Sequence, residues 1–263
     1  MKKHICLTSG CIKRIALDQV TLIAVACIRV PETIKALQYS MRGINFAEVL
    51  LFTDHRPEHL PEGIKYVEIP KIESIEEYSS FILFEAYRYI KTDYALIVQW
   101  DGYVVHPELW NSEFLKYDYI GAPWPEEFNF LDAKGRICRV GNGGASLRSR
   151  RLMSCFSNKG MIQTEENEDV YLCCREKVRL ENDGFQFAPV EVAVRFSQER
   201  RVPETEGVTP FAFHQWEGHN AQYLRFDKSR LFQWKQKLIG FLIRIGIYDR
   251  ERALYRRLIR HEE

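Results

Sequence analysis

The chain has 263 residues, of which 46% are hydrophobic and 28% are charged, and its formal net charge is +1 at pH 7. This length and composition allow a sizeable buried core and exclude disorder over most of the chain. The near-zero net charge provides no global attraction to nucleic acid, so an electrostatic partner has to be bound by a local patch.

The cysteines and the apolar runs indicate the compartment. The seven cysteines are odd in number and lack CxxC spacing, so they predict neither a disulfide framework nor a zinc site. Lys13, Arg14 and Asp18 interrupt the N-terminal region, which is atypical of a signal peptide. The longest apolar runs, 21–28 and 238–247, are shorter than the roughly 20 residues that span a bilayer. We therefore expect a cytoplasmic protein without a transmembrane segment.

The first half of the chain alternates strands and helices. Residues 21–28 (TLIAVACI) are apolar on both faces, as in a central strand of a covered sheet. The predicted elements are strands at 21–28, 47–52, 63–69 and 94–100 and helices at 31–43 and 74–90, the second capped by Ser74. This alternation predicts an α/β fold with a mostly parallel sheet and helices on both faces.

Two aspartates follow strands of this predicted sheet. Asp54 comes after the second strand and Asp101 after the fourth. Ligands of such sheets bind outside the carboxyl ends of the strands, so both carboxylates are expected at the ligand-binding edge. Asp101 precedes a glycine, and Asp-Gly is also a common turn dipeptide, so a purely structural role is the alternative.

The second half is richer in turns. The segment RVGNGGASLRS contains Gly141, Gly143 and Gly144, which allow a tight turn or the close approach of a ligand. Ser149 and Asn167 are predicted N-caps of two further helices. Residues 185–196 are predicted to form another strand region.

The junction after the first strand argues against two nucleotide-binding classes. Its sequence, CIRVPET, contains no glycine, whereas dinucleotide-binding and P-loop folds require a glycine-rich turn there. The remaining way to hold a diphosphate at a strand end is a divalent cation. Hard oxygen ligands such as Asp101 suit Mg²⁺ or Mn²⁺.

Several motifs resemble those of one family. LIVQWDGYVV, YDYIGAPW, VGNGGASLRSRRLM, NEDVYLCC and FAPVEVAVRFSQE, in this order, are similar to signatures of microbial proteins classed with the GT-A-fold glycosyltransferases. The resemblance covers roughly residues 20–217, and the stretch from GGASL to EDV is also similar to the β-galactosyltransferase and fringe family. It implies a GT-A-like, Rossmann-type domain over 20–225, between an N-terminal extension (1–19) and a tail (226–263).

The resemblance also implies an activity and a donor site. The family transfers a sugar from a nucleotide sugar to a glycan or glycolipid acceptor, as in the extension of a surface polysaccharide. Its DxD motif matches Gln99 and Asp101, so the first aspartate is missing. By this match Asp101 and His214 would ligate Mn²⁺ or Mg²⁺, and Arg29, Asp54, Gln99 and Asp101 would bind the nucleotide sugar. The alternative for His214 is a structural histidine.

Catalysis and acceptor binding are assigned in the same way. Asp169 matches the general base of inverting members, with Glu168 as its rival. The predicted acceptor site consists of Asn142, Gly143 and Gly144, with Trp124 as a stacking face. The alternative for the two acids is that they only complement a helix dipole, which would lower the pKa of Asp169. The glycines would then only shape a turn, and Trp124 would belong to the core.

Two other functions stay open at this point. A nucleotidyltransferase would use the same strand ends and cation but needs further basic residues for a triphosphate. A sugar- or nucleotide-binding module without turnover is the other alternative, because the first aspartate of the DxD motif is absent.

The tail is basic and amphipathic. Residues 228–263 include ten Lys or Arg, and the apolar residues at helical spacing are Leu231, Trp234, Leu238, Phe241, Leu242 and Ile245. Such a helix is expected to bind an anionic membrane surface through 228–260, which would place the protein peripherally on the inner face of the membrane. The alternative is a helix packed on the domain with its basic face in solvent.

Overall fold

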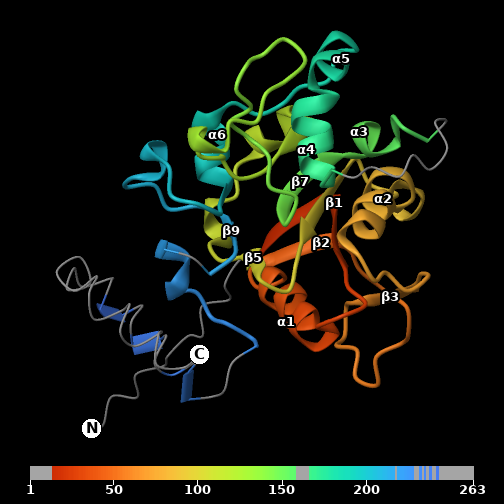
Figure 1. The fold of residues 1–263 in the computed structure, drawn as a ribbon. Coiled ribbons are helices and arrows are strands. Elements are labelled where there is room, and N and C mark those ends of the chain that lie inside the picture. The colour runs from red at the N-terminus through yellow and green to blue at the C-terminus, as the bar shows by residue number, and fades with distance from the viewer. Residues whose placement is uncertain are drawn as a thin grey trace, which may run out of the picture.

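Two sheets organise the chain (Figure 1). The computed structural model describes residues 14–157, 166–216 and 218–227 and, in the tail, 231, 232, 234, 237, 238, 241 and 242. Within these residues the larger sheet has six strands in the order β3-β2-β1-β4-β7-β6, and the smaller has three in the order β5-β9-β8. The strands are β1 (Ile15–Val25), β2 (Ile44–Thr53), β3 (Lys65–Glu68), β4 (Tyr94–Val98), β5 (Gly102–Val104), β6 (Tyr119–Ile120), β7 (Ala145–Ser149), β8 (Ser197–Gln198) and β9 (Ala212–His214).

The larger sheet is mostly parallel, as predicted. β3, β2, β1 and β4 pair in parallel, whereas β7 runs antiparallel to both of its neighbours, β4 and β6. The helices are α1 (Val30–Ser40), α2 (Ile75–Phe84), α3 (Arg150–Ser154), α4 (Glu168–Val170), α5 (Lys177–Asn182) and α6 (Val190–Phe196). Within the described ranges, none of these helices combines the length and apolar composition needed to cross a bilayer.

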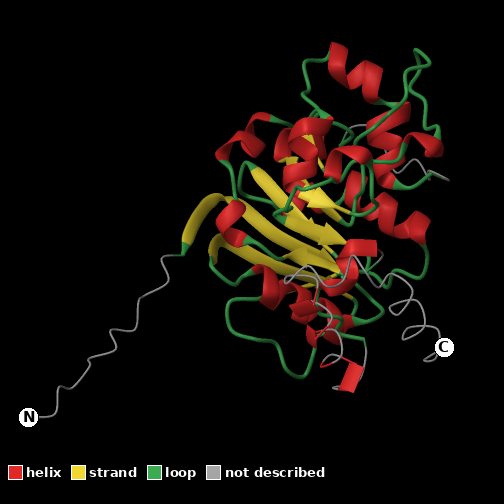
Figure 2. Cartoon of the chain, turned by 90° about the vertical axis from the view of Figure 1, so that its left-hand side faces the viewer, coloured by secondary structure: helices red, strands yellow, loops and turns green. Residues whose placement is uncertain are grey.

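The side-chain alternation of β1 explains why helices cover both faces of the sheet (Figure 2). Leu22 and Ala24 are buried in one apolar cluster together with residues of α1. Ile23 and Val25 point to the opposite face and are buried in a second cluster with residues of α2. A strand that is apolar on both faces therefore requires a helix on each side, which confirms the prediction.

Two predicted helix caps are confirmed. Ser74 Oγ accepts a hydrogen bond from the backbone N–H of Glu77 at 3.1 Å and begins α2. Ser149 Oγ accepts one from the backbone N–H of Leu152 at 3.0 Å and begins α3. The helix predicted at 74–90 divides into α2 and a 3₁₀ turn, Ala86–Tyr89.

The strand predicted at 185–196 is wrong over most of its length. Val190–Phe196 form α6 after Pro189, and within 185–189 only Phe187 makes a bridge, with Tyr119. The alternation of valines with polar residues suggested a strand. Val192 and Phe196 lie four residues apart and bury the same helix face in the main core, so tertiary packing outweighs the β-propensity of valine.

The predicted boundary at residue 19 also needs correction. β1 begins at Ile15, which pairs with Ile44, so the part of the extension from residue 15 onward belongs to the sheet, and residues 1–13 lie outside the described residues. The pairing register shifts between Leu17 and Thr21. Asp18 and Gln19 fall in this irregularity, and their polarity hid the first part of the strand.

A buried carboxylate fixes the antiparallel edge of the sheet. Asp118 accepts hydrogen bonds from the hydroxyl of Ser149, the guanidinium of Arg151 and the backbone N–H of Gln186. Burial raises the pKa of Asp118, but the hydrogen bonds from Arg151 and Ser149 outweigh it, so the pKa lies below its ordinary value. The ionised carboxylate therefore holds β7 and α3 in place.

We expect Asp118→Asn to lower the free energy of unfolding by about 2–4 kcal/mol at pH 7. Because the folded-state pKa is depressed, this stabilisation is present above the unfolded-state pKa of about 3.9 and is lost as the pH falls through the folded value. Urea denaturation at pH 7 and pH 3 measures it. Glu113→Gln, which removes the exposed pair with Arg195, is the control and should cost under about 1 kcal/mol. An Asp118→Asn effect that is equal at both pH values would contradict this account.

Candidate active site

A cavity of about 450 Å³ lies at the carboxyl ends of β1 and β4. Ala26 follows β1 and Gln99 follows β4, and both line it. Further lining residues come from the loop 141–144, the start of α4, the residue after β8 and the end of β9. The polar ones among them include Asn142, Glu168, Asp169, Glu199 and His214. The cavity thus occupies the edge of the sheet at which the sequence predicts ligand binding.

The glycines of the loop 141–144 let site residues approach the backbone. A Cβ atom on Gly143 would lie 1.7 Å from Glu168 Oε1, and one on Gly144 would lie 2.2 Å from His214 Nε2. Asn142, between Gly141 and Gly143, adopts a left-handed backbone conformation with φ of 62°. Its Oδ1 accepts a hydrogen bond from the backbone N–H of Gly144, and its buried Nδ2 has no partner among the described residues.

Glu168 is held in a buried ion pair. Arg148 Nη2 lies 2.7 Å from Glu168 Oε1, and the side chains are 1% and 6% exposed. Arg148 also donates through Nε to Ser146 Oγ, and the backbone N–H of Glu168 donates to Ser79 Oγ. The carboxylate of Glu168 is therefore already engaged by Arg148.

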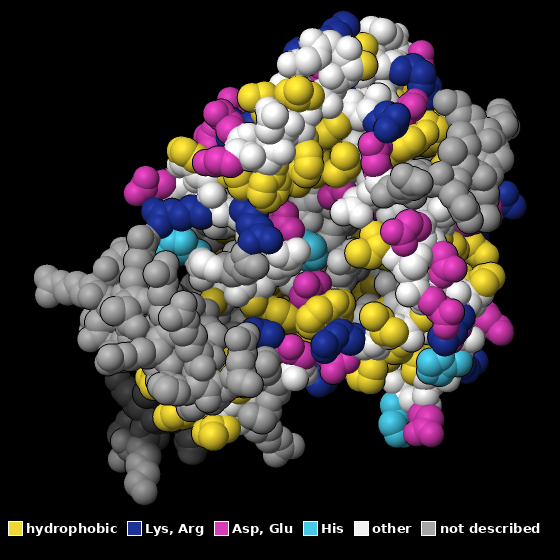
Figure 3. All heavy atoms as spheres, in the orientation of Figure 1, with side chains coloured by type: hydrophobic (Ala, Val, Ile, Leu, Met, Phe, Trp, Pro, Cys, Tyr) yellow, Lys and Arg dark blue, Asp and Glu magenta, His cyan; other side chains and the backbone are white. Residues whose placement is uncertain are grey.

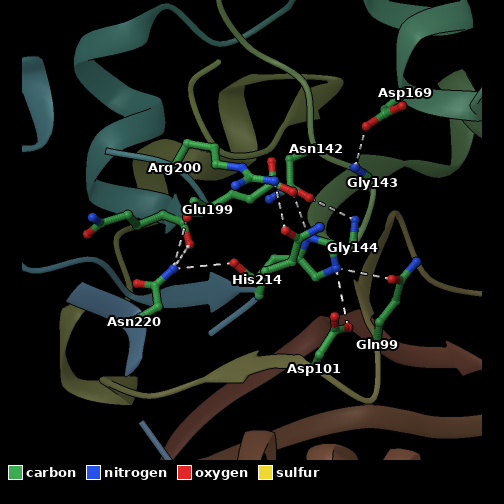
Figure 4. Close-up of polar contacts among 12 residues, drawn as sticks. Gln99, Asp101, Asn142, Gly143, Gly144, Asp169, Glu199, Arg200, His214 and Asn220 are labelled. Carbon is green, nitrogen blue, oxygen red and sulfur yellow. Dashed lines mark hydrogen bonds and ion pairs between the residues drawn. The ribbon is translucent and has the colours of Figure 1, made fainter. Parts of the chain in front are cut away.

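Asp169 lines the cavity, and the described part of the chain places no cationic partner at hydrogen-bond distance from it. Its Oδ2 accepts a hydrogen bond from the backbone N–H of Gly143 at 3.0 Å, and its Oδ1 accepts one from the backbone N–H of Val170 at 2.8 Å (Figure 4). Burial and the neighbouring charge of Glu168 raise its pKa to about 7, against the lowering effect of these hydrogen bonds and of Arg148. The expectation that a helix dipole lowers this pKa is wrong, because burial and the charge of Glu168 dominate.

His214 lies between two carboxylates. Antiparallel pairing of β5 with β9 sets His214 opposite Gly102. Its Nδ1 is 3.2 Å from Glu199 Oε1, and its Nε2 is 3.1 Å from Gln99 Oε1 and 3.4 Å from Asp101 Oδ1 (Figure 4). Burial lowers the pKa of His214, but Asp101 and Glu199 outweigh it and raise the pKa to about 10. The imidazole is therefore cationic at neutral pH.

The predicted metal ligands Asp101 and His214 lie next to each other. Asp101 is absent from the cavity lining, which corrects the expectation that its carboxylate stands at the mouth, because it points to His214. Its Oδ1 is buried and accepts no hydrogen bond from the residues that the structure describes. With His214 Nε2 and Gln99 Oε1 it forms a set of N and O donors that suits Mn²⁺ once the histidine has lost its proton. Among the described residues, no three His, Cys, Asp or Glu side chains form a metal-binding group.

Three other predicted residues lie outside the lining. The Arg29 guanidinium is 4.3 Å from the ring of Trp100, which does line the cavity. Asp54 is hydrogen-bonded to His55 beside it. Trp124 is 3% exposed and packs against Phe130, so the prediction of a stacking face is corrected to a core position.

Four residues of the site were not predicted from the sequence. Arg148 and Glu199 fall within quoted motifs, and Tyr78 was placed only on an amphipathic helix, where its hydroxyl in fact accepts a hydrogen bond from Gln99 Nε2. Gln215 lines the cavity with φ of 61°, a conformation that costs energy outside glycine. No local pattern marks Arg148 or Glu199, because each lies among other polar and basic residues, in SLRSRR and SQERR.

A larger cavity of about 810 Å³ contains none of the predicted site residues. Tyr39, Tyr103, Tyr223, Arg42 and Arg201 are among the residues that line it. It is therefore separate from the candidate active site.

Comparison with known proteins identifies the family. Residues 63–214 match the family described as "Protein of unknown function (DUF5672)". The chain belongs to this family. The DUF5672 region extends from the segment before β3 to the end of β9 and includes Gln99, Asp101, Asp169 and His214.

No curated protein matches the sequence. Among solved structures, the mannosyltransferase PcManGT from Pyrobaculum calidifontis, in complex with GDP-Man and Mn²⁺, is 12% identical with a TM-score of 0.42. The match covers 64% of this chain and 53% of that one, so the chain spans about half the length of the mannosyltransferase. An active-site mutant of LgtC is 12% identical with a TM-score of 0.45, and the match covers 84% of this chain and 95% of that one.

The Arg148–Glu168 pair allows a test of the site's electrostatics. We expect Arg148→Leu to lower the free energy of unfolding by about 3–5 kcal/mol, because it leaves Glu168 charged and buried. The double variant Arg148→Leu/Glu168→Leu should recover most of this loss. Denaturant unfolding of the two single variants and the double variant gives the coupling. Additive losses would show that the two groups do not compensate each other.

Proposed function

We propose that the protein is a glycosyltransferase that transfers a sugar from a nucleotide-sugar donor to a hydroxyl group of a glycan or glycolipid. The observation that carries this proposal is Asp169, a carboxylate with a pKa of about 7 in the wall of a cavity at the carboxyl ends of parallel strands. The ordered motif resemblance to GT-A-fold enzymes supports the same class. A general base is most effective when its pKa lies near the working pH.

The proposed reaction inverts the anomeric carbon. The acceptor hydroxyl binds beside Asp169, which takes its proton as the oxygen attacks the anomeric carbon of the donor. The bond between this carbon and the diphosphate oxygen breaks, and the nucleoside diphosphate leaves with the bonding electrons. Gly143 supports this role because its N–H holds Oδ2 of Asp169 and so orients the carboxylate.

The remaining residues divide between acceptor and donor. Asn142 has a buried Nδ2 without a partner among the described residues, and this N–H group can donate to a sugar hydroxyl of the acceptor. On the donor side, His214 offers a cationic ring in the lining, and Arg29 adds a second cation next to Trp100. Both positive charges favour a diphosphate at this side of the cavity.

A divalent cation is part of the proposal. Asp101 Oδ1 and His214 Nε2, with Gln99 Oε1, would hold it. The cation would take the place of the proton on His214, so that its charge replaces that of the imidazolium. When bound, Mn²⁺ or Mg²⁺ would supply positive charge to the leaving diphosphate.

The catalytic assignment is tested with Asp169→Asn. We expect nucleotide-sugar turnover to fall at least about 100-fold, because an amide cannot accept the proton, whereas binding of the nucleoside diphosphate stays unchanged. A screen of UDP- and GDP-sugars with mass-resolved products identifies the donor, and thermal stabilisation measures binding. Asp183→Asn, the same change on an exposed side chain, is the control. Retained turnover in Asp169→Asn would reject the base, and nucleotide binding without turnover of any donor would indicate a binding module.

The cation site is tested by its pH dependence. Because the pKa of His214 is about 10, the cation must displace a proton at neutral pH. We expect Mn²⁺ affinity to rise about tenfold per pH unit between pH 6 and 8, with release of about one proton in calorimetry. Asp101→Asn should weaken this binding, and His55→Ala, at an exposed histidine, should leave it unchanged. An affinity independent of pH would remove His214 from the ligand set.

A further inference from the structure

The tail presents an apolar stripe to solvent. Its described residues are helical, and Leu231, Trp234, Leu238 and Phe241 are 62%, 62%, 45% and 54% exposed. Their spacings of three, four and three residues place them on one side of a helix. Figure 1 shows the described tail segments in dark blue at the lower left, away from the larger sheet, and Figure 3 shows hydrophobic side chains at the surface of this region.

A different side of the same helix faces the domain. Phe232 is 7% exposed, and the guanidinium of Arg225 lies 5.5 Å from its ring. At 100° per residue, Phe232 lies well away from the stripe that contains Trp234. A helix packed on the domain through its apolar stripe would bury Trp234 and Leu238, so the exposed fractions show that the stripe is not the face that contacts the domain.

The charge of the segment complements an anionic surface. Residues 228–263 contain ten Lys or Arg and four Asp or Glu, a net charge of +6, whereas the whole chain has +1. Lys235 directly follows Trp234 in the sequence, and Lys237, three residues after Trp234, is exposed. Basic residues beside an exposed stripe with Trp, Phe and Leu are typical of helices that lie in the headgroup region of anionic bilayers.

We propose that the tail docks the protein on an anionic lipid surface, with Leu231, Trp234, Leu238 and Phe241 inserted at the boundary between headgroups and acyl chains. The +6 charge disfavours a second copy as the occupant, because two such tails repel each other. Lipid binding needs no nucleotide sugar, so it is independent of the proposed function. If both hold, the cavity operates next to a surface that carries lipid-linked acceptors.

The test measures binding of the full chain to vesicles by co-sedimentation. The vesicles are phosphatidylcholine alone or phosphatidylcholine with about one third phosphatidylglycerol. We expect at least about tenfold tighter binding to the anionic vesicles, weakened by 0.5 M NaCl because salt screens the charges. The variant Trp234→Glu/Leu238→Glu should lose at least about tenfold in affinity. Its urea midpoint should equal that of the unmodified protein, because both side chains are exposed.

The matched control is Ile137→Glu, at a hydrophobic side chain that is 46% exposed outside the tail. It should bind anionic vesicles like the unmodified protein. Equal binding to both kinds of vesicle, or an equal loss in the control, would overturn the proposal. Failure of the unmodified protein to bind vesicles would also overturn it. If the unmodified protein forms a dimer without lipid and the double variant is a monomer, the occupant of the stripe is a second copy of the chain and not a membrane.

Discussion

One buried guanidinium faces two carboxylates in the wall of the cavity, and this imbalance of charge sets the chemistry of the site. Arg148 makes its ion pair with Glu168, so Asp169 is left to backbone hydrogen bonds. Burial and the charge of Glu168 then raise the pKa of Asp169 to about 7. Because this folded-state value exceeds the unfolded value of about 3.9, ionisation of Asp169 destabilises the fold as the pH rises between them. The arrangement therefore lowers the free energy of unfolding at neutral pH, and it gives the site a carboxylate that can accept a proton near neutral pH.

The same constraint explains the loop 141–144. Glu168 approaches Gly143, and His214 approaches Gly144, so closely that neither position admits a side chain. The N–H of Gly143 also orients Asp169. The loop therefore contacts both the start of α4 and the end of β9, and the cationic ring of His214 and the carboxylate of Asp169 line the same cavity. This combination of charges suits a reaction in which a proton leaves the acceptor while negative charge develops on a diphosphate.

The sequence was sufficient for features that depend on local pattern. The two-faced apolar run of β1 predicted the covered sheet, and Ser74 and Ser149 predicted helix starts because capping involves residues only three apart. Patterns failed where tertiary contacts decide. α6 resembles a strand until its packing is known, and the burial of Trp124 depends on contacts with residues distant in sequence, such as Gly141. The motif resemblance led to Asp169, Gln99 and His214, which line the same cavity. The pairing of Arg148 with Glu168 could not be predicted, because it joins residues 20 positions apart. The contact of Asp101 with His214 likewise depends on the tertiary fold.

The pKa of Asp169 is the most direct test of this account. Carboxyl ¹³C chemical shifts followed between pH 4 and 9, with the resonance assigned by its absence from Asp169→Asn, measure this pKa in the folded protein. The account predicts a midpoint near 7. A midpoint at or below 4 would show that the carboxylate is solvated or paired with a cation, and Asp169 would then have no elevated basicity to offer an acceptor hydroxyl.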